Sequence, residues 1–598
     1  MRSLPCVLFL APLLSLAACG GGGGRVSTVG NQDGESSIVF TDAPSDELSM
    51  FEVDVSNIVL KRLSGDSVSV LAKRTTVNFA ELADVGDLIV GAGLVGGFYT
   101  GMTMTLDFSS ATVLINGSTK PAKVLDTNGA EINGSVAVTV SFHNEDRPFV
   151  RANRHHLFQL DLDLDQAITV DSGNNTVTFT PILSASFDPD QPKPVWRTGL
   201  LNSVDPAASS FTIQKRGSDE TAIGTYTVKV GNSTVYQVDG VGYGGAAGLT
   251  ALAALANGAR VHVEGTLDKS TRTLNATWVE AGLGVVGNGQ DWIEGLITAR
   301  TGGPGANATL TVLGQSRRGE RGARAFNTSH TVSVAYATTR VLRRGASNSF
   351  NTDDLEVGQR VLAFGTLSGT TLDASSAAGG IVRELPTHVS GIANGPVASN
   401  VLTMNASRVG LRPITDFNFT VSNVVQLNPA AFTVATTGLA TGAIANGSKV
   451  RATGWMRRVG TTTGQDLTSV GLLDRSRTHG VLTCTWSRAN AKAFASIAAT
   501  GIGIDVSAAD KKQIDNGFDK LTLTVSPTPM LKPADTFGVY RILRKHDDIE
   551  VHTRFATFAS ALQAQLDDGA RVSRVGALVE SSGGAQIYNV SGIAVRLE

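Results

Sequence analysis

The stretch "GARVHVEG" at residues 258–265 recurs three more times along this chain of 598 residues. The other copies are "GQRVLAFG" (358–365), "GSKVRATG" (447–454) and "GARVSRVG" (569–576). In each copy a basic residue follows the first glycine by two positions, a valine by three and a second glycine by seven. Four copies with identical spacing indicate one structural unit repeated in tandem. The motif glycines are Gly258 and Gly265, Gly358 and Gly365, Gly447 and Gly454, and Gly569 and Gly576.

The residues around each motif predict the fold of the unit. A glycine-plus-aliphatic start leads into three strand-like runs, and a small helix is expected before the motif, as in "AAGLTALAALANG" (246–258). Closing strands follow the motif. The order β-β-β-α-β-β predicts a small OB-like barrel. The first glycine of the motif is then expected to end the helix, and the second to permit a sharp bend of a strand.

These repeats also resemble domain of unknown function 5666, which carries the same G-x-x-V core. The expected units are repeat 1 (residues 198–283), repeat 2 (294–385), repeat 3 (388–476) and repeat 4 (477–598). Repeat 4 is the most divergent, because it carries an insert around "RANAKAFASIAATGIGIDVSAADKKQIDNGF" (488–518).

Residues 36–190 form a different, acidic module. Residues 26–190 carry 22 acidic and 9 basic side chains, whereas the whole chain has a net charge of only −2. Apolar residues alternate with polar ones in four runs, which predicts strands with one buried face. We therefore expect an antiparallel β-sandwich here, and an all-β chain overall. The alternating sets begin at Phe51, Met102, Val136 and Phe158.

This module is similar to domain of unknown function 4382. The similarity rests on "IVFTDAPSDELSMFEVDVSNIVLKR" (38–62), "GLVGGFYTGMTMTL" (93–106) and "FQLDLDLDQAITV" (158–170). The resemblance implies a β-sandwich-like fold in a bacterial envelope lipoprotein. It carries over no activity.

The first residues are typical of an export signal. Arg2 precedes an apolar run from Leu4 to Leu14, which is too short to span a bilayer. The cleavage motif Leu16, Ala17, Ala18 and Cys19 resembles the bacterial lipobox, which implies that the Cys19 thiol takes a diacylglycerol after residues 1–18 are removed. The alternative is an ordinary cleaved signal peptide with an incidental cysteine.

Residues 19–35 are interpreted as the lipidated cysteine and its tether. Gly20–Gly24 make the tether flexible, and the segment reaches at most about 55–60 Å when fully extended. Gly20 after the cysteine implies sorting to the outer membrane of a Gram-negative cell. Of the two other cysteines, Cys6 falls in the leader, and Cys484 in "GVLTCTW" is interpreted as a small buried hydrophobe.

The run "DLDLD" is the candidate metal site. Asp161, Asp163 and Asp165 are expected on one face of a strand, where carboxylates with added loop oxygens could bind calcium. The competing interpretation is a solvated acidic face opposite the buried residues of that strand. Asp42 in "TDAP" is expected to cap a turn before Pro44.

Other motifs are interpreted as structural. "GLGVVG" (282–287) has no following helix pattern and is expected to link two repeats rather than bind a dinucleotide. His155 and His156 are adjacent, so their side chains should point to opposite faces of a strand. The cluster Arg317, Arg318, Arg321 and Arg324 is expected in a solvated hairpin loop that touches anionic headgroups or polysaccharide.

Taken as a whole, the sequence favours a lipid-anchored protein of the bacterial cell envelope with a binding or structural role and no cofactor. The expected partners are the membrane, through the anchor, and an envelope polysaccharide or protein, but no nucleic acid. The alternative is a surface lipoprotein that binds a divalent metal or a glycan through its acidic module. An enzyme is the third possibility, since no paired acid and base or nucleophile stands out.

Overall fold

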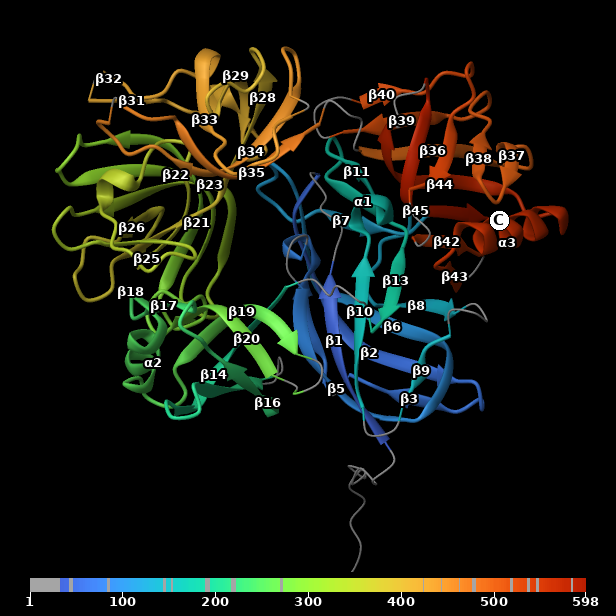
Figure 1. Ribbon diagram of the computed structural model, residues 1–598, viewed down its shortest axis with the longest axis horizontal. Coiled ribbons are helices and arrows are strands. Elements are labelled where there is room, and N and C mark those ends of the chain that lie inside the picture. The colour runs from blue at the N-terminus through green and yellow to red at the C-terminus, as the bar shows by residue number, and fades with distance from the viewer. Residues whose placement is uncertain are drawn as a thin grey trace, which may run out of the picture.

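Five modules follow one another around a closed loop in the computed structural model (Figure 1). The structure describes residues 33–598 except 42–46, 72, 83–85, 143–146, 152–153, 189–193, 217–221, 269–270, 272, 423, 443, 462, 476–479, 517–519, 535–537, 545–547 and 582–584. The predicted leader and cleavage motif, Cys19 and Asp42 therefore lie outside the described residues.

The N-terminal module (described residues 33–188) is the predicted sandwich. One sheet runs β13-β10-β1-β5 and the other β3-β2-β6-β8. The expectation of purely antiparallel pairing is wrong at two positions, because β1 pairs in parallel with β10 and β7 pairs in parallel with β12. The elements are β1 (Asp33–Thr41), β2 (Leu48–Arg62), β3 (Ser67–Ser69), β4 (Thr75–Asn78), η1 (Phe79–Glu81), β5 (Gly86–Val95), β6 (Gly97–Ile115), β7 (Lys123–Leu125), β8 (Ser135–Phe142), β9 (Phe149–Val150), β10 (His155–Leu162), α1 (Leu164–Ala167), β11 (Ile168–Asp171), β12 (Thr176–Phe179) and β13 (Leu183–Phe187).

The alternating apolar residues form the core between the two sheets, as predicted. Members of all four sets are buried together: Phe51, Val53, Val55, Met102, Met104, Leu106, Phe108, Val138, Val140, Phe142, Phe158, Leu160 and Leu162. Asp54 differs from the expected solvated face. It is buried between β2 and the end of β6, where it accepts hydrogen bonds from Thr76 and Ser110 and pairs with Arg74.

Repeats 1, 2 and 3 are closed five-stranded barrels of the OB type, which confirms the fold predicted from the motif. In repeat 1 the strands pair in the order β14-β15-β16-β20-β19 and back to β14. In repeat 2 the ring is β21-β22-β23-β26-β25, and in repeat 3 it is β28-β29-β33-β35-β34. In all three, the third and fourth strands of the ring, in the order given, pair in parallel.

The first strands of repeats 1, 2 and 3 begin at Val195, Asp291 and Thr387. Repeat 1 consists of β14 (Val195–Asp205), β15 (Ser210–Arg216), β16 (Ala222–Lys229), β17 (Val235–Val238), β18 (Val241–Gly244), α2 (Gly245–Ala253), β19 (Arg260–Asp268) and β20 (Thr273–Ala281). Repeat 2 consists of β21 (Asp291–Thr301), β22 (Ala308–Arg317), β23 (Arg324–Val334), β24 (Arg340–Arg343), η3 (Thr352–Asp354), β25 (Arg360–Ser368), β26 (Thr371–Asp373) and β27 (Ile381–Leu385). Repeat 3 consists of β28 (Thr387–Ala393), β29 (Val401–Val409), β30 (Arg412–Pro413), η4 (Ile414–Asp416), β31 (Thr420–Val421), β32 (Val424–Val425), η5 (Pro429–Ala431), β33 (Phe432–Ala435), β34 (Lys449–Met456) and β35 (Leu467–Asp474).

Repeat 4 is the divergent copy. Its first strand pairs with the motif strand and also with an inserted hairpin, β39–β40. The elements are β36 (Gly480–Asn490), β37 (Phe494–Ala498), β38 (Gly501–Ile504), β39 (Lys511–Asp515), β40 (Lys520–Thr522), β41 (Met530–Pro533), β42 (Val539–Leu543), β43 (Asp548–His552), α3 (Phe555–Asp567), β44 (Val572–Ser581) and β45 (Ile587–Leu597).

Both sheets of the sandwich continue into other modules. Strand β5 pairs in parallel with β14 of repeat 1, through Gly86 opposite Val195 and Asp87 opposite Trp196. Strand β8 pairs in parallel with β43 of repeat 4, from Thr139 opposite Asp548 to Phe142 opposite Val551. The N-terminal module is therefore held on two sides by backbone hydrogen bonds to the first and the last repeat.

The first motif glycine adopts a left-handed backbone conformation in every repeat. The φ angles are +89° at Gly258, +91° at Gly358, +84° at Gly447 and +95° at Gly569. The predicted helix before it exists only in repeats 1 and 4. Repeat 2 has the single turn η3 and repeat 3 has turns in the described residues 436–448, so the expectation of a helix is wrong there. Of the four first glycines of the motif, only Gly569 directly follows a helix, because the C-cap residue of α3 is Asp568.

The second motif glycine lies where two strands approach closely. A Cβ atom would be 2.0 Å from the Asn275 carbonyl oxygen at Gly265, 2.1 Å from that of Asp373 at Gly365, and 2.0 Å from that of Thr468 at Gly454. The ladder shifts register at Gly265 and again at Gly454. These shifts agree with the predicted bend at Gly265 and Gly454, and at all three positions only glycine fits.

The two glycines of repeat 1 make a matched test of these roles. Gly258→Ala places a Cβ in open space, so it costs only the left-handed strain of about 1–2 kcal/mol. Gly265→Ala must push two strands apart, and we expect a loss of roughly 3 kcal/mol or more. Thermal unfolding followed by circular dichroism should show a larger fall in Tm for Gly265→Ala. An equal or smaller fall would contradict the close-approach role.

Candidate functional site

The predicted anchor residues Leu16, Ala17, Ala18 and Cys19 lie outside the described residues, so the anchor stays a prediction. Within the described part of the chain, the search for helices with the length and apolarity of a membrane span found none. Cys484 is fully buried in β36, as predicted. Burial raises the pKa of its thiol to about 12, so it is a core residue rather than a nucleophile.

The three aspartates of "DLDLD" do not share one face of a strand. Strand β10 ends at Leu162, so Asp161 belongs to the strand, Asp163 follows it and Asp165 lies in α1. Asp161 accepts a hydrogen bond of 3.1 Å from the Thr41 hydroxyl. The strand geometry on which the metal prediction depended is therefore wrong. Among the described residues, no group of three or more His, Cys, Asp or Glu side chains is placed to hold a metal ion.

Asp163 instead connects two modules that are distant in sequence. Its carboxylate is buried and lies 3.0 Å from Nη1 of Arg541, on β42 of repeat 4. Burial lowers the pKa of Arg574 on β44, and the charge of Asp163 opposes that shift. Two guanidinium groups thus face this carboxylate. The charge of the Asp163 carboxylate therefore stabilises the contact between repeat 4 and the sandwich, beside the β8–β43 pairing.

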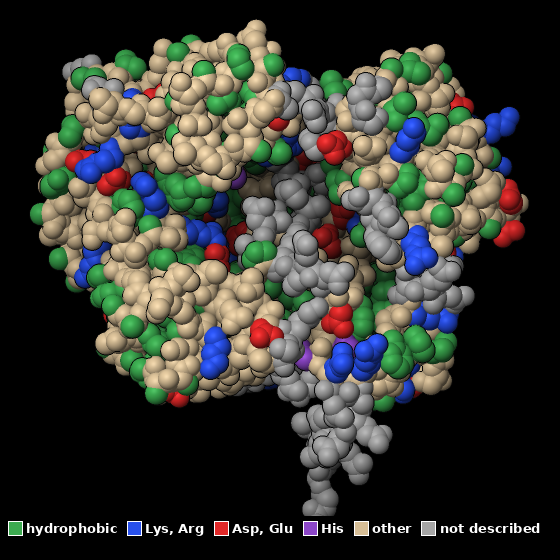
Figure 2. All heavy atoms as spheres, in the orientation of Figure 1, with side chains coloured by type: hydrophobic (Ala, Val, Ile, Leu, Met, Phe, Trp, Pro, Cys, Tyr) green, Lys and Arg blue, Asp and Glu red, His purple; other side chains and the backbone are tan. Residues whose placement is uncertain are grey.

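The basic cluster of repeat 2 is also partly an interface. Arg324 forms a bidentate ion pair with Glu52 of the N-terminal module, at 2.8 and 3.0 Å. Phe326 packs against Met50 and Leu114 beside it. The prediction of a fully solvated loop is therefore wrong for Arg324 on β23 and for Arg317, which is half-buried at the end of β22, while Arg318 and Arg321 are exposed. On the face drawn in Figure 2, basic and acidic side chains are interspersed.

The contact between repeats 1 and 2 contains a buried ion pair. Nε of Arg383 lies 2.7 Å from the Glu280 carboxylate, and both side chains are buried. Arg383 also donates to the Gln237 side chain and to the Gly284 carbonyl oxygen. Gly284 belongs to "GLGVVG", which lies between β20 and β21 as the predicted link between repeats, with three glycines at positive φ.

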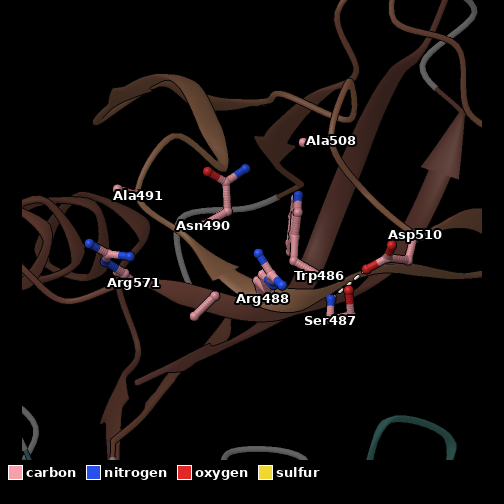
Figure 3. A pocket seen from close by; sticks show the side chains of 9 residues that line it. Trp486, Ser487, Arg488, Asn490, Ala491, Ala508, Asp510 and Arg571 are labelled. Atoms are coloured by element: carbon pink, nitrogen blue, oxygen red, sulfur yellow. Dashed lines mark hydrogen bonds between the residues drawn. The ribbon is translucent and has the colours of Figure 1, made fainter.

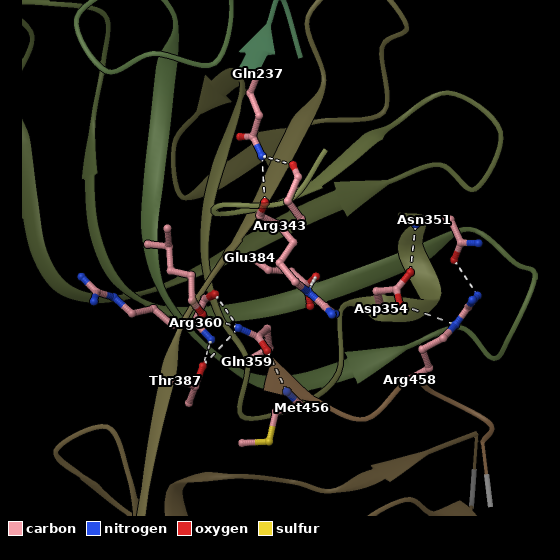
Figure 4. A network of polar contacts seen from close by, with 12 residues as sticks. Gln237, Arg343, Asn351, Asp354, Gln359, Arg360, Glu384, Thr387, Met456 and Arg458 are labelled. Atoms are coloured by element: carbon pink, nitrogen blue, oxygen red, sulfur yellow. Dashed lines mark hydrogen bonds and ion pairs between the residues drawn. The ribbon is translucent and has the colours of Figure 1, made fainter. Parts of the chain in front are cut away.

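The contact between repeats 2 and 3 is organised by the second residue of the motif (Figure 4). Gln359 is fully buried, and its Nε2 donates to the Leu385 carbonyl and the Thr387 hydroxyl. Its Oε1 accepts from the backbone N–H of Met456 in repeat 3. Close by, Arg458 of repeat 3 donates to the Asn351 side chain. Repeats 1, 2 and 3 are thus tied in sequence by buried polar contacts as well as by the linkers.

Glu384 lies in the same network and carries a strongly shifted pKa. Its carboxylate is fully buried and lies 2.8 Å from Nε of Arg343. Burial raises the pKa of Glu384 to about 7, although the Arg343 charge opposes the rise. Gln237 of repeat 1 donates to the Arg343 carbonyl, and the Arg343 guanidinium lies over the Trp455 ring of repeat 3, so Glu384 sits where three repeats come together.

The adjacent histidines point to different surroundings, as predicted. A ring nitrogen of His155 lies 2.9 Å from the Ser37 hydroxyl. His156 is buried, stacks on Phe187 and places Nδ1 at 2.7 Å from the Asp188 carboxylate. Its Nε2 accepts from the backbone N–H of Arg151. Both histidines therefore connect strands of the sandwich.

Repeat 4 contains a pocket of about 400 Å³ at the end of β36 (Figure 3). Its polar lining comes from the end of β36, the segment after β38 and the residue before β44: Trp486, Ser487, Arg488, Asn490, Asp510 and Arg571. Sequence reasoning missed this site. The one available signal was Arg571, which is the basic residue of the fourth motif.

Most polar groups of this pocket are hydrogen-bond donors. The Trp486 side chain is 4 % exposed, and its indole N–H has no hydrogen-bond partner in the described chain. Asn490 uses its carbonyl oxygen to accept from the backbone N–H of Lys492, which leaves the NH2 group as a donor. The only carboxylate, Asp510, is engaged by the backbone N–H and the hydroxyl of Ser487, which lower its pKa.

Comparison with known proteins found no match. No family model matches the chain, and neither a curated protein nor a solved structure matches it. The resemblance of the N-terminal module and of the repeats to two domain families therefore stays a prediction.

The buried pair between the sandwich and repeat 4 predicts a structural role for Asp163. Asp163→Asn leaves Arg541 buried without its counter-charge, and we expect a loss of about 3–5 kcal/mol. Glu131→Gln, which breaks the exposed Lys123–Glu131 pair, should cost less than about 1 kcal/mol. Thermal unfolding checks both variants. If millimolar calcium raises the Tm of the wild type but not the Tm of Asp163→Asn, the result would instead support a metal site.

The raised pKa of Glu384 predicts that the stability of the folded protein depends on pH. Its folded-state pKa of about 7 exceeds the ordinary value of 4.5, so its stabilisation is complete below pH 4.5 and is lost as the pH rises through 7. Glu384→Gln imitates the protonated acid. The variant and the wild type should therefore have similar Tm values at pH 5, and the variant should be the more stable at pH 8. A Tm difference that is constant between pH 5 and pH 8 would rule out this titration.

Proposed function

We propose that this protein is a lipid-anchored component of the bacterial cell envelope that acts as a binding or structural scaffold, without catalysis. The observation that carries the proposal is the sequence Leu16-Ala17-Ala18-Cys19 between an apolar run and Gly20–Gly24. Two or three acyl chains on Cys19, each contributing about 0.8 kcal/mol per buried CH2, would hold the chain at a membrane.

The architecture supports a scaffold role. Backbone pairing at β5–β14 and β8–β43, together with the buried pairs Asp163–Arg541 and Glu280–Arg383, ties the modules into one body. A body of this kind presents its surfaces in fixed positions relative to one another. A flexible tether of glycines would let the whole body stand away from the membrane surface.

Metabolic labelling with a clickable fatty acid tests the anchor in the bacterium that makes the protein. We expect the wild type to be labelled and to fractionate with membranes, because the lipid is attached to the Cys19 sulfur. Cys19→Ala should lose both properties, while Cys6→Ala, which changes a leader cysteine, should keep them. A Cys19→Ala chain that remains labelled would refute the proposal.

A further inference from the structure

We propose that the pocket at the end of β36 in repeat 4 binds the oxyanion group, a carboxylate, sulfate or phosphate, of a small ligand about the size of a monosaccharide. This inference goes beyond the proposed anchoring role and does not depend on it. It rests on the kinds of groups that line the pocket and on the partners that those groups lack.

The charge of the lining favours an anion. Arg488 and Arg571 are both exposed, and within the described residues neither guanidinium forms a hydrogen bond or an ion pair. Two cations that share one pocket repel each other, and a bound anion removes that cost. Guanidinium groups also match the planar fork of a carboxylate and the oxygens of sulfate or phosphate.

The position of Arg571 in the motif makes its lack of a partner informative. The equivalent residue of repeat 1, Arg260, pairs with Glu320, and that of repeat 2, Arg360, pairs with Glu294. In repeat 4 the corresponding side chain faces a pocket instead of a carboxylate. An external anion would provide the counter-charge that the protein itself supplies in repeats 1 and 2.

The uncharged part of the lining points to the same ligand chemistry. The indole N–H of Trp486 is a buried donor without a partner, a situation that costs free energy unless an acceptor arrives. Figure 3 shows the indole standing up from β36 with its ring nitrogen at the end away from the strand. The NH2 group of Asn490 adds a second neutral donor on the pocket wall. The lining therefore offers several donors and no free carboxylate.

The size of the pocket sets the size of the ligand. A volume of about 400 Å³ lies within the range of about 300–1,000 Å³ that is usual for small-molecule sites. A bare inorganic ion would leave most of this space to water. An acidic sugar unit would place its oxyanion against the arginines and its hydroxyl groups against the remaining polar lining.

Isothermal titration calorimetry on the full chain carrying Cys19→Ala tests the site without the anchor. The probes are glucuronate, glucose 6-phosphate, sodium sulfate and glucose. We expect the two acidic sugars to bind and glucose not to bind. Sulfate binding as tightly as the sugars would identify a free inorganic anion as the source of the oxyanion. No binding of any anion at 10 mM (about −2.7 kcal/mol) would overturn the proposal.

Three variants locate the binding. Arg571→Ala and Arg488→Ala should each weaken glucuronate binding about tenfold or more, and Arg571→Lys should restore part of it. Trp486→Phe, which removes the N–H but keeps an aromatic ring, should weaken binding about threefold to tenfold. The matched control is Arg554→Ala, an exposed arginine at the start of α3 that does not line the pocket.

Both pocket arginines are exposed, so we expect their substitution to leave the fold intact. Unchanged Tm values then establish that the variants being compared are equally folded. An Arg554→Ala loss equal to that of Arg571→Ala would overturn the proposal, since binding would then reflect net charge alone. Binding that survives in the Arg488→Ala/Arg571→Ala double variant would place the anion elsewhere. Neither result would bear on the lipid anchor, which labelling of Cys19 tests separately.

Discussion

The unpaired edges of the N-terminal sandwich are the constraint around which the rest of the chain is arranged. An open sheet ends in a row of backbone N–H and C=O groups that need partners, and an exposed edge invites aggregation. Here β14 pairs with the first two residues of β5, and β43 pairs with the second half of β8. Because these partners come from the first and the last repeat, pairing at these two edges requires the four repeats to curve back onto the sandwich. The closed course of the chain in Figure 1 follows from this requirement.

Backbone pairing sets the direction of each junction, and buried charges then make it specific. A parallel β8–β43 pair alone could slip in register, since backbone groups repeat along a strand. The Asp163–Arg541 pair allows only one register, because any slip would leave two charges buried without partners. The pair Glu280–Arg383 and the fully buried Gln359 act in the same way at the next two junctions. Polar groups that would be costly in a simple core thus define how the modules fit together.

Features that depend on neighbours along the chain could be predicted from the sequence. The alternation around Phe51, Met102 and Phe158 marks buried strand faces, and the spacing of the motif glycines marks the barrel closure. Features that depend on distant parts of the chain could not. Asp163 and Arg541 are 378 residues apart, so nothing near "DLDLD" indicated that its second carboxylate already had a partner. For the same reason the sequence predicts a solvated Arg324, although Glu52 lies against it. The pocket of repeat 4 combines three separate segments, of which only the motif residue Arg571 carried a local signal.

The repeated basic position shows how one motif can serve two purposes. Its place in the barrel is set by the left-handed glycine two residues earlier, so the backbone geometry is alike at Gly258, Gly358 and Gly569. What differs is the surface that each barrel meets. Arg260 and Arg360 lie within reach of Glu320 and Glu294, and there the positive charge serves packing between or within repeats. Arg571 belongs to the copy whose insert rebuilds the region after the first strand, and there the same charge is left facing solvent beside Trp486 and Arg488. Divergence of the fourth repeat has thus changed a structural cation into one that is available to a ligand.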